Sequence, residues 1–153
     1  MKKQHIYGIL VVIWMSLIFS MSAQVAHESQ AMSDSLLDVI LAFFHITFLQ
    51  QENFKDMISF LIRKAAHMSE YAILAILVYK YFASRKMRHV YSYAFIISVL
   101  YACSDEIHQL FVSGRSGEMM DVGIDSCGAF IGLSLLSIVM HIMNKRRSRH
   151  GIE

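Results

Sequence analysis

The chain has 153 residues, of which 56% are hydrophobic and 17% are charged, and its formal net charge is +2. Soluble domains are about 45–50% apolar and about 25% charged, so a water-facing globule of this size could not bury all of these apolar side chains. The composition therefore indicates a membrane protein. It excludes a disordered chain, a collagen, a disulfide-rich secreted domain and a protein that binds nucleic acid through a basic tail.

Four apolar stretches are predicted to span the membrane, at 6–22, 65–82, 90–111 and 119–143. Each is close to the ~20 residues that a helix needs to cross a bilayer, and the chain contains no Pro that would break a helix. The last three stretches carry carboxylates near one end. The predicted fold class is an all-α membrane protein, in which residues 1–153 form one domain built as a bundle of four transmembrane helices.

The basic residues predict the orientation of these spans. With four spans, those before the first, between the second and third and after the fourth lie on one side, which is the cytoplasmic side by the positive-inside rule. They are Lys2, Lys3, Arg85, Lys86, Arg88, Lys145, Arg146, Arg147 and Arg149. Every acidic residue except Glu153 falls in an outer loop or in the outer end of a span. We therefore expect both termini to lie in the cytoplasm.

Two parts of the N-terminal region have alternative interpretations. A basic start, an apolar core and small residues near Ala23 are also typical of a cleaved signal peptide. In the outer segment 23–62, Ser33, Asp34 and Ser35 are expected to cap a short amphipathic helix. Its apolar positions are Leu36, Leu37, Ile40, Leu41, Phe44 and Phe48, and a second apolar stretch follows at 54–62. These segments either lie in the outer interface or cap the bundle as a pair of short helices.

Ionisable residues gather near the outer ends of the last three spans. At 100° per residue, most polar residues of one span share a helical face, whereas Glu106 is turned about 100° from Asp105. The sets are Arg63, His67, Glu70 and Tyr71 in the second span, Asp105, His108 and Gln109 in the third, and Asp121 and Asp125 in the fourth. Beneath the last pair, Gly128 and Gly132 predict the close approach of another helix.

These residues predict a common pocket that opens outward. Glu70, Asp105 and Asp125 each lie roughly 10 Å from the outer end of their span, and Lys64 and Arg115 would supply compensating positive charge. Charge inside a span costs about 2.5–3.5 kcal/mol per residue, which favours a functional site over simple packing. The alternative is a set of interhelical ties that neutralise one another. The spacings His67-x-x-Glu70 and Asp105-x-x-His108 also fit ligands of a divalent metal, which stays open.

The motifs follow one another in a defined order. They are Arg63-Lys64-x-x-His67-x-x-Glu70-Tyr71, Ser104-Asp105-Glu106-Ile107-His108-Gln109-Leu110-Phe111 and Gly114-Arg115-x-Gly117-x-x-x-Asp121-Val122-x-x-Asp125, closing with Gly128. This combined pattern resembles the VanZ-like family of bacterial polytopic membrane proteins, whose namesake is associated with teicoplanin resistance. The resemblance covers most of the chain, because a first span that contains Trp14 fits it too.

The resemblance implies a multi-pass protein of the bacterial cytoplasmic membrane that lowers susceptibility to lipoglycopeptide antibiotics such as teicoplanin. We expect its pocket to bind or modify an envelope amphiphile, so that its partner is a membrane lipid or a lipid-linked envelope component and not a nucleic acid. An enzyme would use His67, Glu70, Asp105, Glu106, His108, Asp121 and Asp125 for acid–base chemistry, and Lys64, Tyr71, Gln109 and Arg115 to bind the substrate. The alternatives are a non-enzymatic binder, a proton or cation relay, and a scaffold of an envelope complex.

Overall fold

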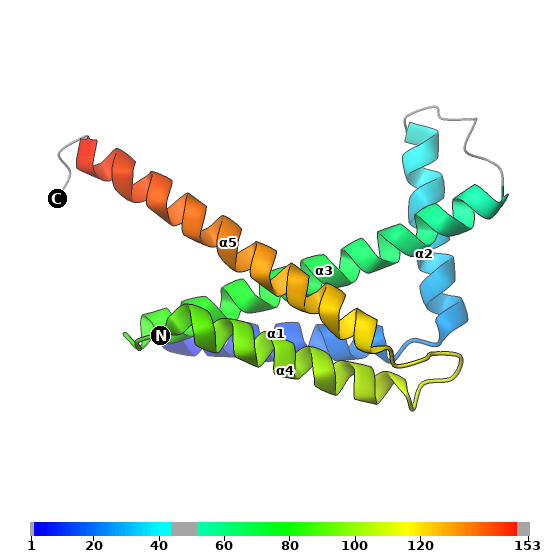
Figure 1. Ribbon diagram of the computed structural model, residues 1–153, viewed down its shortest axis with the longest axis horizontal. Coiled ribbons are helices and arrows are strands. Elements are labelled where there is room, and N and C mark those ends of the chain that lie inside the picture. Colours follow the sequence, from blue (N-terminus) through cyan, green and yellow to red (C-terminus); the bar gives the residue numbers. More distant parts are fainter. Residues whose placement is uncertain (1, 44–51, 150–153) are drawn as a thin grey trace.

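The structure, a computed structural model, describes residues 2–43 and 52–149, and within these ranges the chain forms five helices and no strand. The helices are α1 (Lys3–Ser22), α2 (Ala26–Phe43), α3 (Glu52–Ser84), α4 (Val90–Gln109) and α5 (Met119–Arg149). Four of them form the bundle, whereas α2 projects from the end of α1 and packs against α3 (Figure 1). The all-α prediction is confirmed.

The second helix differs from the short capped helix that the sequence predicts. α2 has 18 residues and begins at Ala26, so Ser33 and Ser35 lie inside it. Their hydroxyls donate to the carbonyl oxygens of Ser29 and Ala31, at 3.1 and 2.8 Å. This bond to the residue four positions earlier satisfies the hydroxyl within the helix, so neither serine is an N-cap. Of the apolar positions expected in this helix, Phe44 and Phe48 lie outside the described residues.

The apolar stretch at 54–62 belongs to α3 and is not a separate helix. α3 has 33 residues and continues through the expected span 65–82 as far as Ser84. Neither Gly nor Pro occurs between Glu52 and Ser84, so no strong helix breaker interrupts the helix. The other bounds also shift: α4 ends at Gln109 rather than at residue 111, and α5 continues past residue 143 to Arg149.

α3 is the central helix, because it contacts each of the other four. α5 crosses it in the form of an X (Figure 1). At the crossing, a Cβ on Gly132 would lie 2.6 Å from the carbonyl oxygen of Ala72, and a Cβ on Gly128 would overlap the backbone of Met68. Only glycine allows the two backbones to approach so closely. The close crossing places the first turns of α5 beside the middle of α3.

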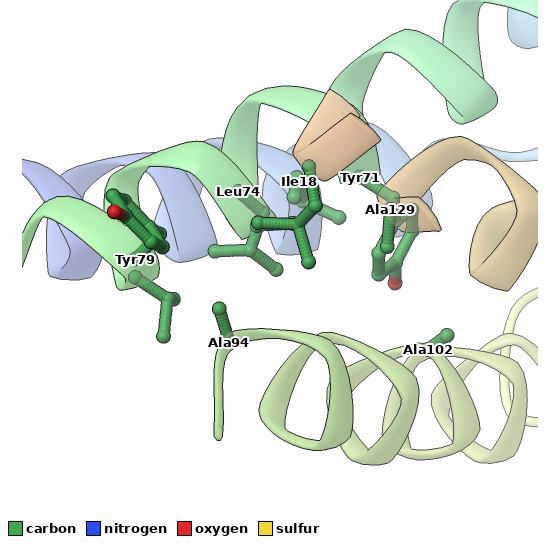
Figure 2. Packing of buried hydrophobic residues seen from close by; sticks show 10 residues of the cluster. Ile18, Tyr71, Leu74, Tyr79, Ala94, Ala102 and Ala129 are labelled. Carbon is green, nitrogen blue, oxygen red and sulfur yellow. The ribbon is translucent and has the colours of Figure 1, made fainter. Parts of the chain in front are cut away.

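The apolar core lies between α1, α3, α4 and α5 (Figure 2). Its members include Ile18, Tyr71, Leu74, Ala94, Ala102 and Ala129. Two hydrogen bonds fasten α1 to its neighbours: the Trp14 indole donates to the carbonyl of Glu70 at 2.9 Å, and the Tyr101 hydroxyl donates to the carbonyl of Met15 at 2.6 Å. α1 is therefore a packed wall of the bundle.

Large apolar side chains face outward from the bundle. Val12, Leu100 and Leu135 are 64%, 63% and 56% exposed, one on each of three helices. Such surfaces are uncommon on water-soluble bundles, and they suit contact with lipid. Two helices are long and apolar enough to cross a membrane, over Lys3–Ser22 and Met119–Ser148.

Only two of the four expected spans therefore qualify by length and composition among the described residues. α3 and α4 do not qualify. α3 carries Arg63, Lys64 and Glu70 in its middle third, and α4 carries Asp105 and Glu106 near its C-terminal end. They belong to the candidate functional site.

The two ends of the bundle differ in charge. The start of α1, the turn between α3 and α4, and the end of α5 lie at one end (Figure 1). This end carries Lys2, Lys3, Arg85, Lys86, Arg88, Lys145, Arg146 and Arg147. At the opposite end, the loop 110–118 meets the start of α2 through a backbone hydrogen bond from Ala26 to Ser113 of 3.5 Å. The carboxylates of α4 and α5 lie toward that second end.

Candidate functional site

An ion pair joins α3 to α5 at the α2 end of the bundle. The Lys64 ammonium contacts a carboxylate oxygen of Asp121, and the two side chains are 18% and 19% exposed. One turn further along α5, Asp125 is only 2% exposed. Both carboxylates and Glu106 line a cavity of about 10 Å³, which is close to the space that one water molecule needs. α5 therefore presents one paired and one buried carboxylate to α3 and α4.

His67 lies at the centre of the site. Its Nδ1 is 3.4 Å from Oε2 of Glu70, which follows one turn later on α3. The imidazole lines the small cavity and two larger cavities of about 170 Å³ each. The contact with Glu70 is an ion pair when the imidazole is protonated, and within the described residues Glu70 Oε2 has no hydrogen-bond partner. His67 therefore places an imidazole at a wall that the two larger cavities share.

The amide of Gln109 connects the two carboxylates of α4. Its Nε2 donates to Asp105 Oδ2 at 3.3 Å and to Glu106 Oε1 at 3.2 Å. Glu106 Oε2 also accepts a hydrogen bond of 2.9 Å from the backbone N–H of Glu118, directly before α5 begins. A carboxylate is stabilised at a helix N-terminus by the unpaired N–H groups there. Glu106 thus ties α4 to the start of α5.

Three of the predicted site residues do not line these cavities. The ring of His108 stacks on Phe19 with centroids 4.2 Å apart, so it faces α1. Tyr71 is fully buried in the core (Figure 2), and Asp105 is 2% exposed and bonded to Gln109. Asp105 and His108 are therefore not among the residues that line these three cavities, although Asp105 is bonded to Gln109, which lines the polar one of the two larger cavities. The physical reason is that α1 packs against the face of α4 that carries His108, whereas sequence reasoning gave α1 no part in the site.

Two larger cavities adjoin at His67, each of about 170 Å³. The first, named the polar chamber, is lined by Arg63, Lys64, His67, Gln109, Arg115 and Asp121, among others. The second, named the apolar chamber, is lined mainly by Met21, Met32, Leu36, Ile62 and Ala66, from α1, α2 and α3. Three side chains line both chambers: Arg63, His67 and Arg115. A charged space and an apolar space therefore meet at two guanidinium groups and one imidazole.

Arg115 fastens the loop 110–118 to the end of α1 and to α2. Its guanidinium donates to the carbonyl oxygen of Ser22 at 3.0 Å and to the hydroxyl of Ser29 at 3.3 Å. Burial lowers the pKa of Arg115, and the nearby charge of Arg63 lowers it further. An arginine still remains protonated at neutral pH, because its ordinary pKa is far higher. Arg115 is thus a permanent positive charge at the junction of the chambers.

The geometry does not support the divalent-metal site with which the spacings of His67 and Glu70 and of Asp105 and His108 are compatible. Among the described residues, no group of three or more His, Cys, Asp or Glu side chains is placed to hold a metal ion. His67 is paired with Glu70, whereas His108 stacks on Phe19 of α1. The positive charge of the site comes from its lysine and arginine side chains.

Sequence reasoning missed the contribution of α1 and α2. Met21 reaches the site because the end of α1 packs against α3, and Ser29 and Met32 reach it because α2 packs against α3. No motif marks these residues in the sequence. Arg63 did carry a signal, since it shares a helical face with His67 and precedes Lys64. Its place at the junction of the chambers depends on the loop that brings Arg115 beside it, which helical spacing cannot show.

A family model described as VanZ/LLP1 matches residues 7–140, which include parts or all of the five helices. This match confirms the resemblance that the motifs indicated. No curated protein and no solved structure matches the chain significantly. Together with two helices of transmembrane length, the family match indicates a membrane protein.

Proposed function

We propose, from the premise that the chain belongs to the VanZ/LLP1 family, that it binds the polar end of a cell-envelope amphiphile at the outer face of the bacterial cytoplasmic membrane. Its partner is a membrane lipid or a lipid-linked envelope component. Occupying or withdrawing this partner lowers susceptibility to lipoglycopeptide antibiotics such as teicoplanin. The protein crosses the membrane four times, through α1, the C-terminal part of α3, α4 and α5, with both termini in the cytoplasm.

The distribution of charge supports this topology. Basic residues concentrate at the end of the bundle that holds the start of α1 and the end of α5, which the positive-inside rule assigns to the cytoplasm. α3 and α4 lie against the two helices of span length and carry their charged residues toward the opposite end. Those charges face one another across the bundle, where they are shielded from lipid. The site then opens toward the outer surface.

The observation that carries the proposal is the pair of adjoining chambers. An amphiphile has a polar part that is directly attached to an apolar part. The two chambers match this arrangement, because they share three lining residues, Arg63, His67 and Arg115. A soluble polar ligand would leave the apolar chamber unused, and an apolar ligand would leave the charges of the polar chamber unpaired. Pockets of this kind gain affinity from apolar walls and orientation from a few polar groups.

Asp125→Asn tests the buried carboxylate that shares the small cavity with His67, the residue that lines both chambers. The change keeps the shape of a side chain that is 2% exposed and removes its charge. Asp121 is less suitable, because its loss would also leave Lys64 without its ion-pair partner. We expect the Asp125→Asn variant to accumulate in the membrane at the parent level and to lose most of the protection against teicoplanin. Mass spectrometry of co-purified lipids should show the partner lipid reduced at least several-fold.

The matched control is Asp56→Asn, which removes an exposed carboxylate of α3 that lines a separate cavity between α2 and α3. It should keep both the co-purified lipid and the protection. Full protection by Asp125→Asn at equal expression would mean that the buried carboxylate is a structural tie. Full protection and unchanged co-purified lipid in a His67→Gln variant as well, at equal expression, would make a scaffold of an envelope complex the better explanation.

A further inference from the structure

Two guanidinium groups at the junction of the chambers have only neutral hydrogen-bond partners. Arg63 donates to the side-chain oxygen of Gln30 at 3.2 Å, and Arg115 donates to Ser22 and Ser29. Within the described residues, neither arginine has a carboxylate oxygen within 4.0 Å. Lys64 differs from them, because it is already paired with Asp121.

The two positive charges are held near each other at some cost. Arg63 is the second largest contribution, after burial, to the lowered pKa of Arg115. The carboxylates of Asp105, Glu106 and Asp121 act in the opposite direction, and each contributes less than Arg63 does. Like charges at a half-buried site repel, and a bound anion removes this repulsion. The arrangement therefore favours a ligand with negative charge at this point.

The geometry of the guanidinium group indicates which anions it would bind. A guanidinium presents a planar fork of N–H donors that matches phosphate and carboxylate oxygens, and arginine is the residue most used for such recognition. The polar chamber, of about 170 Å³, is far larger than the cavity of about 10 Å³ that suits one water molecule, so it can take a group of the size of a phosphate. Because the apolar chamber starts at the same two arginines, the anion would carry an apolar chain on that side.

We infer that Arg63 and Arg115 form a clamp for the phosphate group of an anionic lipid, whose apolar chain enters the apolar chamber beside Met32 and Leu36. The inference rests on the proposed function and specifies its ligand: a phosphate ester attached to an acyl or polyprenyl chain. His67, which lines both chambers, then lies beside the bond that joins the phosphate to its chain. The clamp assigns a binding role to Arg63, which neither the motifs nor the family match assigns.

The test measures the dissociation constants of four probes with the full chain in detergent micelles. The probes are phosphatidylglycerol, a polyprenyl phosphate, diacylglycerol and inorganic phosphate. We expect either phosphorylated lipid to bind at least tenfold more tightly than diacylglycerol, and the tighter of the two identifies the source of the phosphate. The Arg63→Gln, Arg115→Gln variant should lose that preference, since each charge-assisted hydrogen bond contributes about tenfold or more to affinity.

Two further variants separate binding from folding. Arg63→Lys keeps the charge and loses the fork, so it should retain an intermediate preference for the phosphorylated lipids. Arg85→Gln is the matched control, because this arginine lies at the other end of α3, where it donates to the Tyr81 hydroxyl at 2.8 Å. It should bind all four probes as the parent does.

The outcomes distinguish the clamp from the proposed function. If lipids bind but the glutamine variant keeps the full preference for phosphorylated lipids, the clamp is wrong and amphiphile binding stands. If the parent chain binds none of the lipids, the proposed function fails, and the clamp fails with it. If inorganic phosphate binds as tightly as the phosphorylated lipids, the apolar chamber contributes nothing and the lipid assignment is overturned.

Discussion

The crossing of α3 and α5 gives a prediction whose magnitude follows from the structure. In Gly132→Ala the new Cβ would lie 2.6 Å from the carbonyl oxygen of Ala72, whereas ordinary contacts begin at 3.4 Å. The helices must therefore separate locally by roughly 0.8 Å, or the backbone must bend. Overpacking of this kind costs about 1–3 kcal/mol in a well-packed core. The clash is with backbone, so no side-chain rotation relieves it.

Gly123→Ala is the matched control, because a Cβ at that position of α5 meets nothing within 4 Å. Alanine favours a helix over glycine by about 0.8–1.0 kcal/mol, and this gain is common to both variants. The difference between the two variants therefore isolates the packing cost. We expect Gly132→Ala to have a free energy of unfolding about 1–3 kcal/mol lower than that of Gly123→Ala.

The assay is unfolding in mixed micelles of increasing denaturing detergent, followed by the fluorescence of the only tryptophan, Trp14. Trp14 reports on the bundle because its indole is bonded to the backbone of α3. Equal free energies of unfolding for Gly132→Ala and Gly123→Ala would refute the close crossing. Equal here means within about 0.5 kcal/mol, which is the usual agreement between effects at independent sites.

Three other predictions concern the contacts between helices and the topology. Lys64→Met and Asp121→Asn should each destabilise the bundle, because each leaves the other residue of the ion pair without a partner. In a double-mutant cycle, the two changes should show a coupling free energy of about 0.5–3 kcal/mol, and additive effects of the two changes would exclude this coupling. Trp14→Phe should lose about 0.5–1.5 kcal/mol of stability with its hydrogen bond, measured by far-ultraviolet circular dichroism, and an unchanged transition would argue against that bond. A cysteine at Ser116, in a background without native cysteines, should react with an impermeant reagent in intact cells, and one at Ser148 only after permeabilisation; the reverse pattern would invert the topology.

The spacing of polar residues along single helices predicts much of the site. Lys64 and His67 share a face because helical geometry fixes the angle between them, and Asp121 and Asp125 are one turn apart for the same reason. All four line one small cavity in the structure. Such patterns depend only on the geometry of a single helix, so the spacing of residues in the sequence is enough to predict them.

The rotation of α4 could not be predicted in the same way. It depends on which neighbour packs against each face, and here α1, α3 and α5 all contact α4. The result is that Glu106 faces the cavity, whereas His108 stacks on Phe19 of α1. Hydropathy alone does not identify every expected membrane span either. α1 and α5 meet the criteria of length and composition for a span, whereas α3, which carries charged residues of the site, does not.

α2 contributes to the walls of both chambers. Met32 and Leu36 are the large apolar side chains that it adds to the apolar chamber, whereas the charged groups of the polar chamber come from α3, α5 and the loop 110–118. α2 also accepts hydrogen bonds from both arginines, from Arg63 at Gln30 and from Arg115 at Ser29. Under the proposed function, changes at Met32 and Leu36 would therefore alter which lipid tails fit, whereas changes at Ser29 and Gln30 would disturb the groups that hold the phosphate.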